Sequence, residues 1–181
     1  MCAWGPRPIS QKMKDFLIRS ETASDIRAIR ELTAREFLDA PHSSHTDQFI
    51  VDALRDGNAL SVSLVAEEQD EIVGHIAISP IAISDGSTGW YGLGPVSVLP
   101  AHQRRGVGSC LVRSALDRLR DLKTSGCVLL GDPMFYSRFG FRQQADLVLP
   151  GMPSEYFQTI SFDSSRATGN VEFHAAFSAT G

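Results

Sequence analysis

The segment from Trp90 to Leu130 restricts the fold of this chain more than any other part of the sequence. Residues Trp90–Leu99 form an apolar run interrupted by glycines and a proline, which predicts a strand that bends midway. From Gly106 to Leu122 apolar residues recur every three or four positions, and this spacing predicts an amphipathic helix. The short apolar run Gly126–Gly131 predicts a second, buried strand. Two strands joined by one helix form a β-α-β unit, whose strands run parallel with a right-handed crossover.

The rest of the chain also alternates between strand and helix patterns. A hairpin is predicted on either side of the acidic turn EEQDE, because apolar residues alternate along both flanks. The segment Gln143–Thr168 shows no clear pattern. The other predicted elements are a strand at Phe16–Ser20, a helix at Ser24–Leu38 capped by Ser24, a short helix at Asp47–Arg55, a short helix and turn at Asp132–Phe141, and a last strand at Gly169–Phe177. Together these patterns predict an α/β (α+β) fold.

Length and composition predict the organisation of the chain. Its 181 residues, 43% of them hydrophobic, are enough to bury about 70% of the surface that the unfolded chain exposes. We therefore expect a single domain over residues 1–181, with residues 1–14 flexible.

Charge and cysteine usage exclude several classes of partner. A net charge of -4 and a pI of about 5.7 argue against a nucleic-acid partner, which requires a basic surface. No apolar run approaches the ~18 residues of a membrane span, and the first residues lack a signal-peptide pattern. The three cysteines are widely separated, which favours a reducing compartment. We expect a cytoplasmic protein with no metal, no nucleic-acid partner and no membrane partner.

The loop before the predicted helix has the composition of an anion-binding site. The first turn of a helix leaves N–H groups without partners and carries a partial positive charge. Gly106 and Gly108 would let phosphate oxygens approach these groups, and Arg104 and Arg105 add positive charge. The P-loop sequence is absent, and the dinucleotide-binding fingerprint would require a glycine at Leu111. Phosphate is therefore the predicted ligand of this loop.

Two motifs in this region resemble those of one enzyme family. The hexapeptide QRRGVG (Gln103–Gly108) resembles the Gln/Arg-x-x-Gly-x-Gly/Ala motif of the GNAT superfamily of acyl-CoA-dependent N-acetyltransferases. Further on, YSRFGF (Tyr136–Phe141) resembles the Tyr-x-x-x-Gly-Phe element of the same family. The order of elements from Phe16 to Phe141 also matches. GLGPVSVLP and LLGDPMFYSRFGF are similar to a bacterial subgroup of predicted acetyltransferases.

The resemblance implies a fold and a set of cofactor-binding residues. The expected GNAT fold has a mixed central sheet of about six to seven strands, helices on both faces and a splayed central strand pair. Acetyl-CoA (coenzyme A) is the implied co-substrate, with its acyl group in the gap of the splay. The residues implied to bind it are Val96, Ser97 and Val98 along the pantetheine arm, Arg104, Arg105, Gly106, Val107, Gly108 and Ser109 at the pyrophosphate, and Arg138.

The resemblance assigns one catalytic residue and leaves another role open. Tyr136 is expected mainly to donate a hydrogen bond to the developing CoA thiolate. An acceptor amine with a pKa near 10.4 is neutral in roughly one molecule in 2,500 at pH 7, so some group must take its proton. Many relatives use a carboxylate on the bent strand, but Trp90–Leu99 contains no Asp or Glu. The alternatives left open are Glu36, His42, His45, His75 and Asp132.

Several of these residues also have a simpler structural explanation. Tyr136 could be a core aromatic residue, although the presence of both motifs favours catalysis. Arg138 could contact the cofactor's phosphates or adenine, or be a solvated charge; both interpretations stay open. Cys110 lies in the first helical turn, so an acyl-cysteine route is an alternative to packing beneath the helix, which we favour.

The remaining candidates have expected structural roles. His42 and His45 have a spacing compatible with a metal, but without a third ligand we expect solvated or acceptor-site residues. Cys127 is expected in the core, and Arg113 is expected to pair with Asp117 on the solvent face of the helix.

Two functions therefore follow from the sequence. The first is an N-acetyltransferase that moves an acetyl group from acetyl-CoA to a primary amine of a small molecule, peptide or protein. The second is a non-catalytic acyl-CoA-binding sensor or regulatory module, suggested by the absence of a strand carboxylate. The resemblance allows a homodimer and leaves the acceptor and the acyl chain unspecified.

Overall fold

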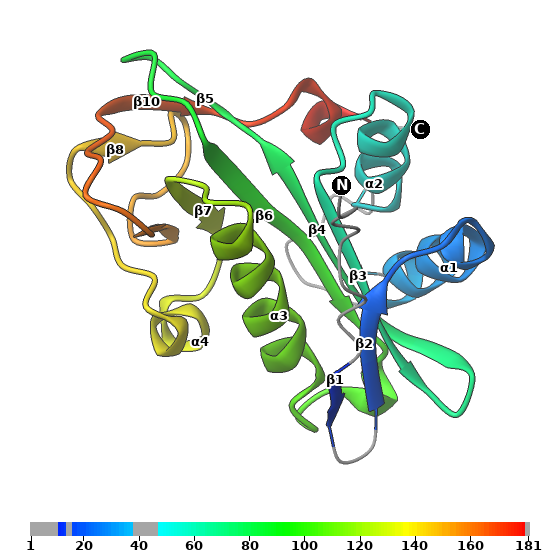
Figure 1. The fold of residues 1–181 in the computed structure, drawn as a ribbon. Helices are drawn as coiled ribbons and strands as arrows, with labels where there is room; N and C mark the ends of the chain where they lie inside the picture. Colours follow the sequence, from blue (N-terminus) through cyan, green and yellow to red (C-terminus); the bar gives the residue numbers. More distant parts are fainter. Residues whose placement is uncertain (1–10, 14–15, 38–46, 180–181) are drawn as a thin grey trace, which may run out of the picture.

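A long mixed sheet forms the centre of the molecule (Figure 1). The computed structural model describes residues 11–13, 16–37 and 47–179. Within them the sheet has seven strands in the order β1-β2-β3-β4-β6-β7-β9, and only β6 and β7 pair in parallel. The strands are β1 (Gln11–Met13), β2 (Phe16–Ser20), β3 (Val62–Glu68), β4 (Glu71–Pro80), β6 (Trp90–Val98), β7 (Gly126–Leu130) and β9 (Phe157–Ser161).

A second, smaller sheet lies at one end of the first. Its order is β5-β10-β8, with β10 antiparallel to β5 and parallel to β8. The strands are β5 (Ala82–Ile83), β8 (Leu147–Val148) and β10 (Gly169–Glu172). A 3-10 turn at Ala175–Ser178 follows β10 and lies against α2 (Asp47–Asp56), as Figure 1 shows.

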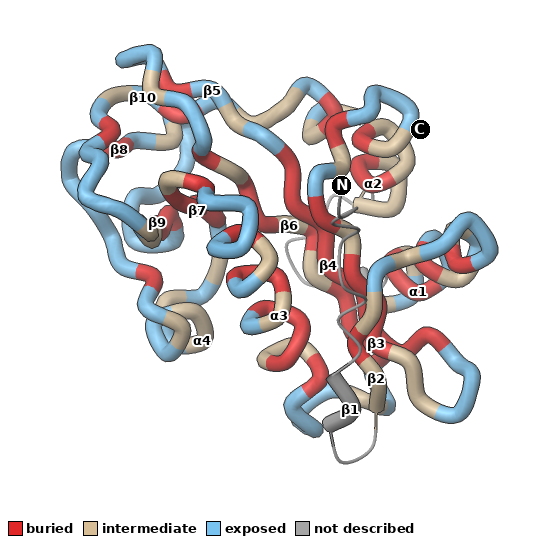
Figure 2. The backbone as a smooth tube through the Cα atoms, viewed as in Figure 1, coloured by how far each residue is buried: buried red, intermediate tan, exposed pale blue. Residues whose placement is uncertain are grey.

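Helices cover both faces of the long sheet, as expected. On one face lie α1 (Ile26–Phe37) and α2, and on the other lies α3 (Val107–Asp121). The short helix α4 (Pro133–Tyr136) follows β7 on the α3 side. Every residue of β4 between its two terminal residues is buried, because helices pack on both of its faces (Figure 2). A Cβ at Gly74 would lie 2.9 Å from Val107 Cγ1, so only glycine lets α3 pack this closely on β4.

The predicted bend in β6 is a β-bulge. Ile76 pairs with Val96 and Ile78 with Leu93, so Gly94 and Pro95 together lie opposite the single residue between Ile76 and Ile78. β6 then diverges from β7: the two strands pair only from Trp90 to Gly92. The expected splay between the central parallel strands is confirmed.

Most predicted elements are confirmed, with three corrections. Ser24 does not cap α1, because it lies inside a 3-10 turn in which the Thr22 N–H donates to Asp25 Oδ2 at 2.7 Å. The last strand ends at Glu172 instead of Phe177. The segment without a clear pattern contains β8 and β9, and β9 is an edge strand of the long sheet. None of the described helices is long and apolar enough to cross a membrane.

Candidate active site

The first turn of α3 has backbone donors that no described side chain caps. The first hydrogen bond inside the helix runs from the Cys110 N–H to the Gly106 carbonyl at 3.0 Å. The N–H groups of Gly106, Val107, Gly108 and Ser109 precede this bond, and the helix start has no side-chain cap. Gly106 has a φ of 90°, which L-residues rarely adopt, so this turn requires glycine. The arrangement suits an anion, as the sequence predicted.

The second glycine of the motif has a different structural role. A Cβ at Gly108 would lie 3.6 Å from Val98 Cγ2 and 3.8 Å from Phe135 Cζ, both ordinary contacts. Gly108 therefore lies against β6 and α4, and the space beside it would accept an alanine.

The two arginines of the motif are not equivalent. Both are exposed, and Arg104 has a positive φ of 60°. Arg105 forms an ion pair with Glu68 at the end of β3, with Nη2 and Oε1 2.6 Å apart, and His102 Nε2 lies 2.8 Å from Glu68 Oε2. The hydrogen bond from Arg105 lowers the pKa of Glu68. An anion at the start of α3 must therefore compete with Glu68 for Arg105 but not for Arg104.

Beyond Gly92 no described strand pairs with the edge of β6 that faces the splay. Antiparallel neighbours alternate between pairs that exchange hydrogen bonds and pairs that do not. The Leu99 N–H donates to the Val73 carbonyl at 3.0 Å, so Ser97, two residues earlier, also bonds toward β4. Val96 and Val98 then direct their backbone groups toward the splay, and the Val98 carbonyl accepts a bond from Gln103 Nε2 at 3.2 Å. Of the three residues predicted along the pantetheine arm, Val96 and Val98 thus have groups at the open edge.

A cavity of about 1150 Å³ begins at this splay. Its splay end is lined by the β6 bulge, Leu93–Val96, together with Leu130 and Tyr136. Its other walls come from segments distant in sequence: α2, β5, the segment 149–152, β10 and the C-terminal turn. The cavity therefore joins the open strand edge to a chamber beneath the small sheet.

Tyr136 lines the cavity and is held by aromatic neighbours. Its ring contacts Phe135 edge-on, with centroids 4.9 Å apart, and Phe141 at 6.0 Å. A Cβ on Gly131 would overlap the tyrosine ring, so the glycine before α4 makes room for it. Burial, followed by the negative charge of Glu36, raises the pKa of Tyr136 to about 12. Tyr136 is thus a protonated hydroxyl at the splay, held there by its aromatic neighbours.

Glu36 lies near the same end of the cavity. Thr33, one turn earlier on α1, is buried with its Oγ1 3.5 Å from Ser97 Oγ of β6, and residues three apart share a helix face. The Oε2 atom of Glu36 is buried and has no hydrogen-bond partner among the described residues. Burial, followed by the charge of Asp47, raises the pKa of Glu36 to about 7. Of the candidate proton acceptors that the structure describes, Glu36 is the one whose charge also acts on Tyr136.

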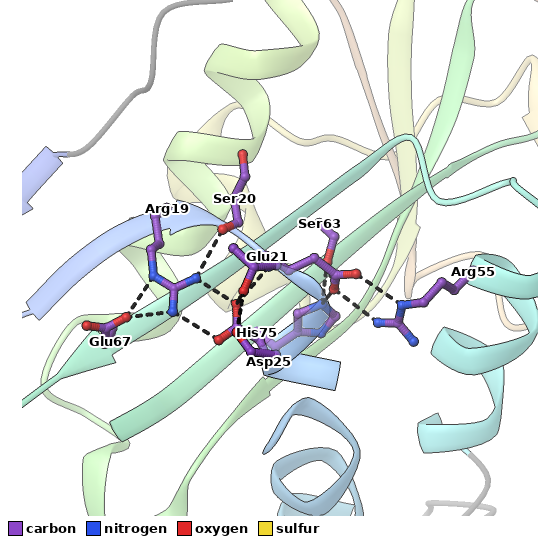
Figure 3. A network of polar contacts seen from close by, with 10 residues as sticks. Arg19, Ser20, Glu21, Asp25, Arg55, Ser63, Glu67 and His75 are labelled. Atoms are coloured by element: carbon purple, nitrogen blue, oxygen red, sulfur yellow. Dashed lines mark hydrogen bonds and ion pairs between the residues drawn. The ribbon is translucent and has the colours of Figure 1, made fainter. Parts of the chain in front are cut away.

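Two other candidate proton acceptors have structural roles. Asp132 caps α4 and accepts a hydrogen bond from the Met134 N–H at 2.8 Å. His75 of β4 is fully buried, in the network of Figure 3. The Ser63 hydroxyl donates to Glu21, so His75 Nε2, 2.8 Å from Ser63 Oγ, must itself donate. Burial lowers the pKa of His75. His42 and His45 lie outside the described residues.

The remaining candidate residues from the sequence pack in the core or stack on aromatic rings. Cys127 is in the core, and burial raises the pKa of Cys110, which disfavours the thiolate that an acyl-cysteine route needs. Arg138 stacks on Phe135 with its guanidinium 4.7 Å from the ring centroid. The predicted pair of Arg113 with Asp117 is wrong. Asp117 instead pairs with Arg120, and Arg113 stacks over an aromatic ring of the turn after α4.

Sequence reasoning missed several residues that line the cavity. Asp47, Glu172 and Phe177 come from α2, β10 and the C-terminal turn, and only tertiary structure brings them together. Asp47 in the first turn of a predicted helix was indistinguishable from a helix-stabilising charge. Among the described residues no group of three or more His, Cys, Asp or Glu side chains could hold a metal ion.

Comparison with known proteins gives consistent matches. A family model described as an acetyltransferase (GNAT) domain matches residues 59–143. The Escherichia coli K12 protein named uncharacterized N-acetyltransferase YhbS is 32% identical over 169 residues, covering 90% of this chain and 98% of that protein. A Brucella melitensis GNAT family acetyltransferase, crystallised with acetyl-CoA, is 45% identical with a TM-score of 0.81, covering 90% of this chain and 97% of that one. The Escherichia coli YhbS crystal structure with CoA has a TM-score of 0.84 at 31% identity, covering 95% and 97%.

Proposed function

The chain belongs to the GNAT family of acetyltransferases, and from that premise we propose that it transfers an acetyl group from acetyl-CoA to a primary amine. The observation that carries this proposal is the position of Tyr136. One cavity joins this protonated hydroxyl to the open edge of β6, beside the uncapped start of α3. Such a site offers N–H donors for a diphosphate, a strand edge for an extended arm and a hydrogen-bond donor at the far end of that arm.

The residues present fit coenzyme A. The N–H groups from Gly106 to Ser109, with Arg104, would hold the diphosphate, and Arg105 would join them on leaving Glu68. Val96 and Val98 would pair with the pantetheine amides. Arg138, stacked on Phe135 close to Gly108, would add charge on the α4 side. Acetyl-CoA supplies the activated acetyl thioester.

We assign the proton transfer from the amine to Glu36 and stabilisation of the leaving thiolate to Tyr136. The amine nitrogen bonds to the acetyl carbonyl carbon while the C–S bond breaks, and the amine's proton goes to the Glu36 carboxylate. A base with a pKa near the working pH suits this task. Tyr136 donates a hydrogen bond to the sulfur as negative charge develops on it. The unpartnered Oε2 of Glu36 and its electrostatic effect on Tyr136 support this assignment.

The test measures cofactor binding and turnover separately. Titration calorimetry with acetyl-CoA checks binding, and thiol release across aliphatic amines, aromatic amines, polyamines and lysine peptides checks transfer. We expect binding together with amine-dependent thiol release. Binding without release for every acceptor would support the non-catalytic sensor, and no binding would exclude both functions.

A further inference from the structure

The chamber beyond the splay has walls of one chemical kind. This inference rests on the proposed function, in which the acyl end of the cofactor occupies the splay between β6 and β7. The rest of the cavity is then left for the acceptor. Its walls are mostly aliphatic and aromatic side chains: Ile50, Ile83, Leu149, Met152, Phe173 and Phe177. These side chains favour an acceptor with an apolar body.

Of the residue types Asp, Glu, Lys and Arg, only the two acidic ones occur among the described lining residues of the chamber. Asp47 and Glu172 line it, and Glu36 lies close enough to Asp47 for that charge to raise its pKa. None of the described lining residues is Arg or Lys. His174 Nδ1 accepts a hydrogen bond from the Ala176 N–H at 3.1 Å and so caps the C-terminal turn. Arg30 of α1 is paired with Asp52 of α2 and stacked over Phe49.

We propose that the acceptor is a primary amine on an aliphatic or aromatic body with no carboxylate or phosphate beside the amine. An ammonium group entering the chamber approaches carboxylates, which attract it and favour its binding. If the acceptor also carried a carboxylate, that group would lose its hydration on entering the chamber. It would be repelled by Asp47 and Glu172, and no described Arg or Lys lines the chamber to pair with it. The chamber therefore selects amines over the corresponding amino acids by repulsion as well as by attraction.

Matched acceptors test this proposal directly. One series is 2-phenylethylamine, phenylalaninamide and phenylalanine, and a second is isoamylamine, leucinamide and leucine. The amides keep the added bulk and remove the negative charge. We expect kcat/KM for each amino acid to be at least about 100-fold below that of its amine, with the amide within about tenfold of the amine. Equal or faster use of the amino acids would overturn the inference and leave the acetyltransferase proposal intact.

A charge-reversal variant separates repulsion from shape. Glu172→Lys places a cation at the exposed edge of the chamber. It should lower the ratio of kcat/KM for the amine to kcat/KM for the amino acid at least about tenfold, with acetyl-CoA affinity unchanged. Asp121→Lys makes the same charge change at the exposed end of α3 and should leave the preference unchanged. An unchanged preference in Glu172→Lys would overturn the role of charge.

The experiments distinguish failure of the acetyltransferase proposal from failure of the proposed acceptor preference. Transfer only to polyamines or lysine peptides from the wider amine panel would overturn this inference alone. Acetyl-CoA binding with no transfer to any amine would overturn the acetyltransferase function and this inference together.

Discussion

At the residue scale, the ionisation state of Tyr136 decides how it can act. Its pKa of about 12 lies well above the value near 8.5 expected for a CoA thiol by analogy with cysteine. Complete proton transfer from the tyrosine to the thiolate would therefore be uphill by about 5 kcal/mol. A hydrogen bond to the charge as it develops requires no such transfer and strengthens toward the transition state.

Replacing this hydroxyl should affect the chemical step and leave binding intact. Tyr136→Phe keeps the ring that packs on Phe135 and removes one hydrogen bond to a developing charge, a loss of about 1.5–3 kcal/mol. We expect kcat to fall roughly 10- to 100-fold, with acetyl-CoA affinity within twofold of wild type. The matched control is Tyr156→Phe, because Tyr156 is exposed and is not a lining residue. A wild-type kcat for Tyr136→Phe on a verified acceptor would refute the assignment.

Ionisation of Glu36 should affect the pH dependence of both activity and stability. A half-buried carboxyl with its pKa raised to about 7 holds its proton more tightly in the folded state than in the unfolded state. Stability is therefore lost as pH rises from about 4.5 to 7, and the loss is complete above that range. Glu36→Gln should raise the melting temperature by about 2–4 °C at pH 8 and have little effect at pH 4.

The same variant should remove the low-pH limb of the rate profile. In the wild type we expect kcat/KM to rise with an apparent pKa near 7, because only the carboxylate accepts a proton. Glu36→Gln should lower kcat/KM at pH 8 by about 100-fold or more and flatten this limb. Glu31→Gln, on the exposed face of α1, is the control. A purely structural role for Glu36 would leave the limb in place.

At the element scale, the two motif glycines can be separated by substitution. Gly106→Ala forces a side chain into a positive-φ conformation, with a strain of about 1–2 kcal/mol, and disturbs the uncapped N–H groups. We expect its CoA affinity to fall at least tenfold by calorimetry, while Gly108→Ala stays within about threefold. Gly86→Ala is the control, since it has a φ of 82° and equally open surroundings but lies away from α3. Equal losses of affinity for both motif variants would contradict this division.

Sequence patterns predicted the elements that have a regular local spacing of apolar residues. The β-α-β unit, the hairpin and the bulge follow from apolar spacing and from the Gly94 and Pro95 pair. β9 was missed because its buried positions include Gln158 and Thr159, whose partners are remote. Gln158 Nε2 donates to the Gly131 carbonyl at 3.0 Å, and Thr159 pairs with Arg142. A strand stabilised by distant polar contacts has no apolar alternation to detect.

At the scale of the whole molecule, one polar network ties four elements together. Glu21, which follows β2, accepts hydrogen bonds from Arg55 of α2 and from Ser63 of β3, next to His75 of β4 (Figure 3). Burial opposes ionisation of Glu21, but the nearby His75 ring N–H, with Nε2 3.7 Å from Oε2, and hydrogen bonds from Arg55 and Ser63 outweigh it and lower the pKa of Glu21 to about 2. The network thus anchors α2, one wall of the cavity, to the centre of the sheet.

Acid unfolding should report on this network. Because the pKa of Glu21 is lower in the folded state, its contribution is complete above about pH 4.5 and is lost as pH falls toward 2. Glu21→Gln should lower the free energy of unfolding at pH 7 by about 2 kcal/mol, and the difference from wild type should shrink below pH 4.5. Denaturant titrations at several pH values measure this. A difference that does not depend on pH would contradict the role of the charge.

The two ends of the cavity differ in how far sequence could predict them. The splay end comes mostly from one stretch, Leu93–Tyr136, which contains the first motif and the first residue of the second. The chamber is built from α2, β5, the segment 149–152 and the C-terminal turn, which meet only in the folded chain. A variant in the chamber should therefore change acceptor use and leave cofactor binding unchanged.

Phe177 allows this separation to be tested. Its ring packs 4.8 Å from that of Phe173, in the cluster that joins the C-terminal turn to α2, and it lines the chamber. Phe177→Ala removes partly buried apolar surface, so we expect about 2 kcal/mol of destabilisation and a melting temperature lower by about 4–8 °C. The acceptor KM should rise about tenfold because the widened chamber holds the acceptor less closely, while acetyl-CoA affinity stays within twofold. Phe162→Ala, partly buried against the main core and not a lining residue, should cost similar stability and leave the acceptor KM unchanged. Parallel losses of acceptor and cofactor binding in Phe177→Ala would mean that the two ends of the cavity act as one site.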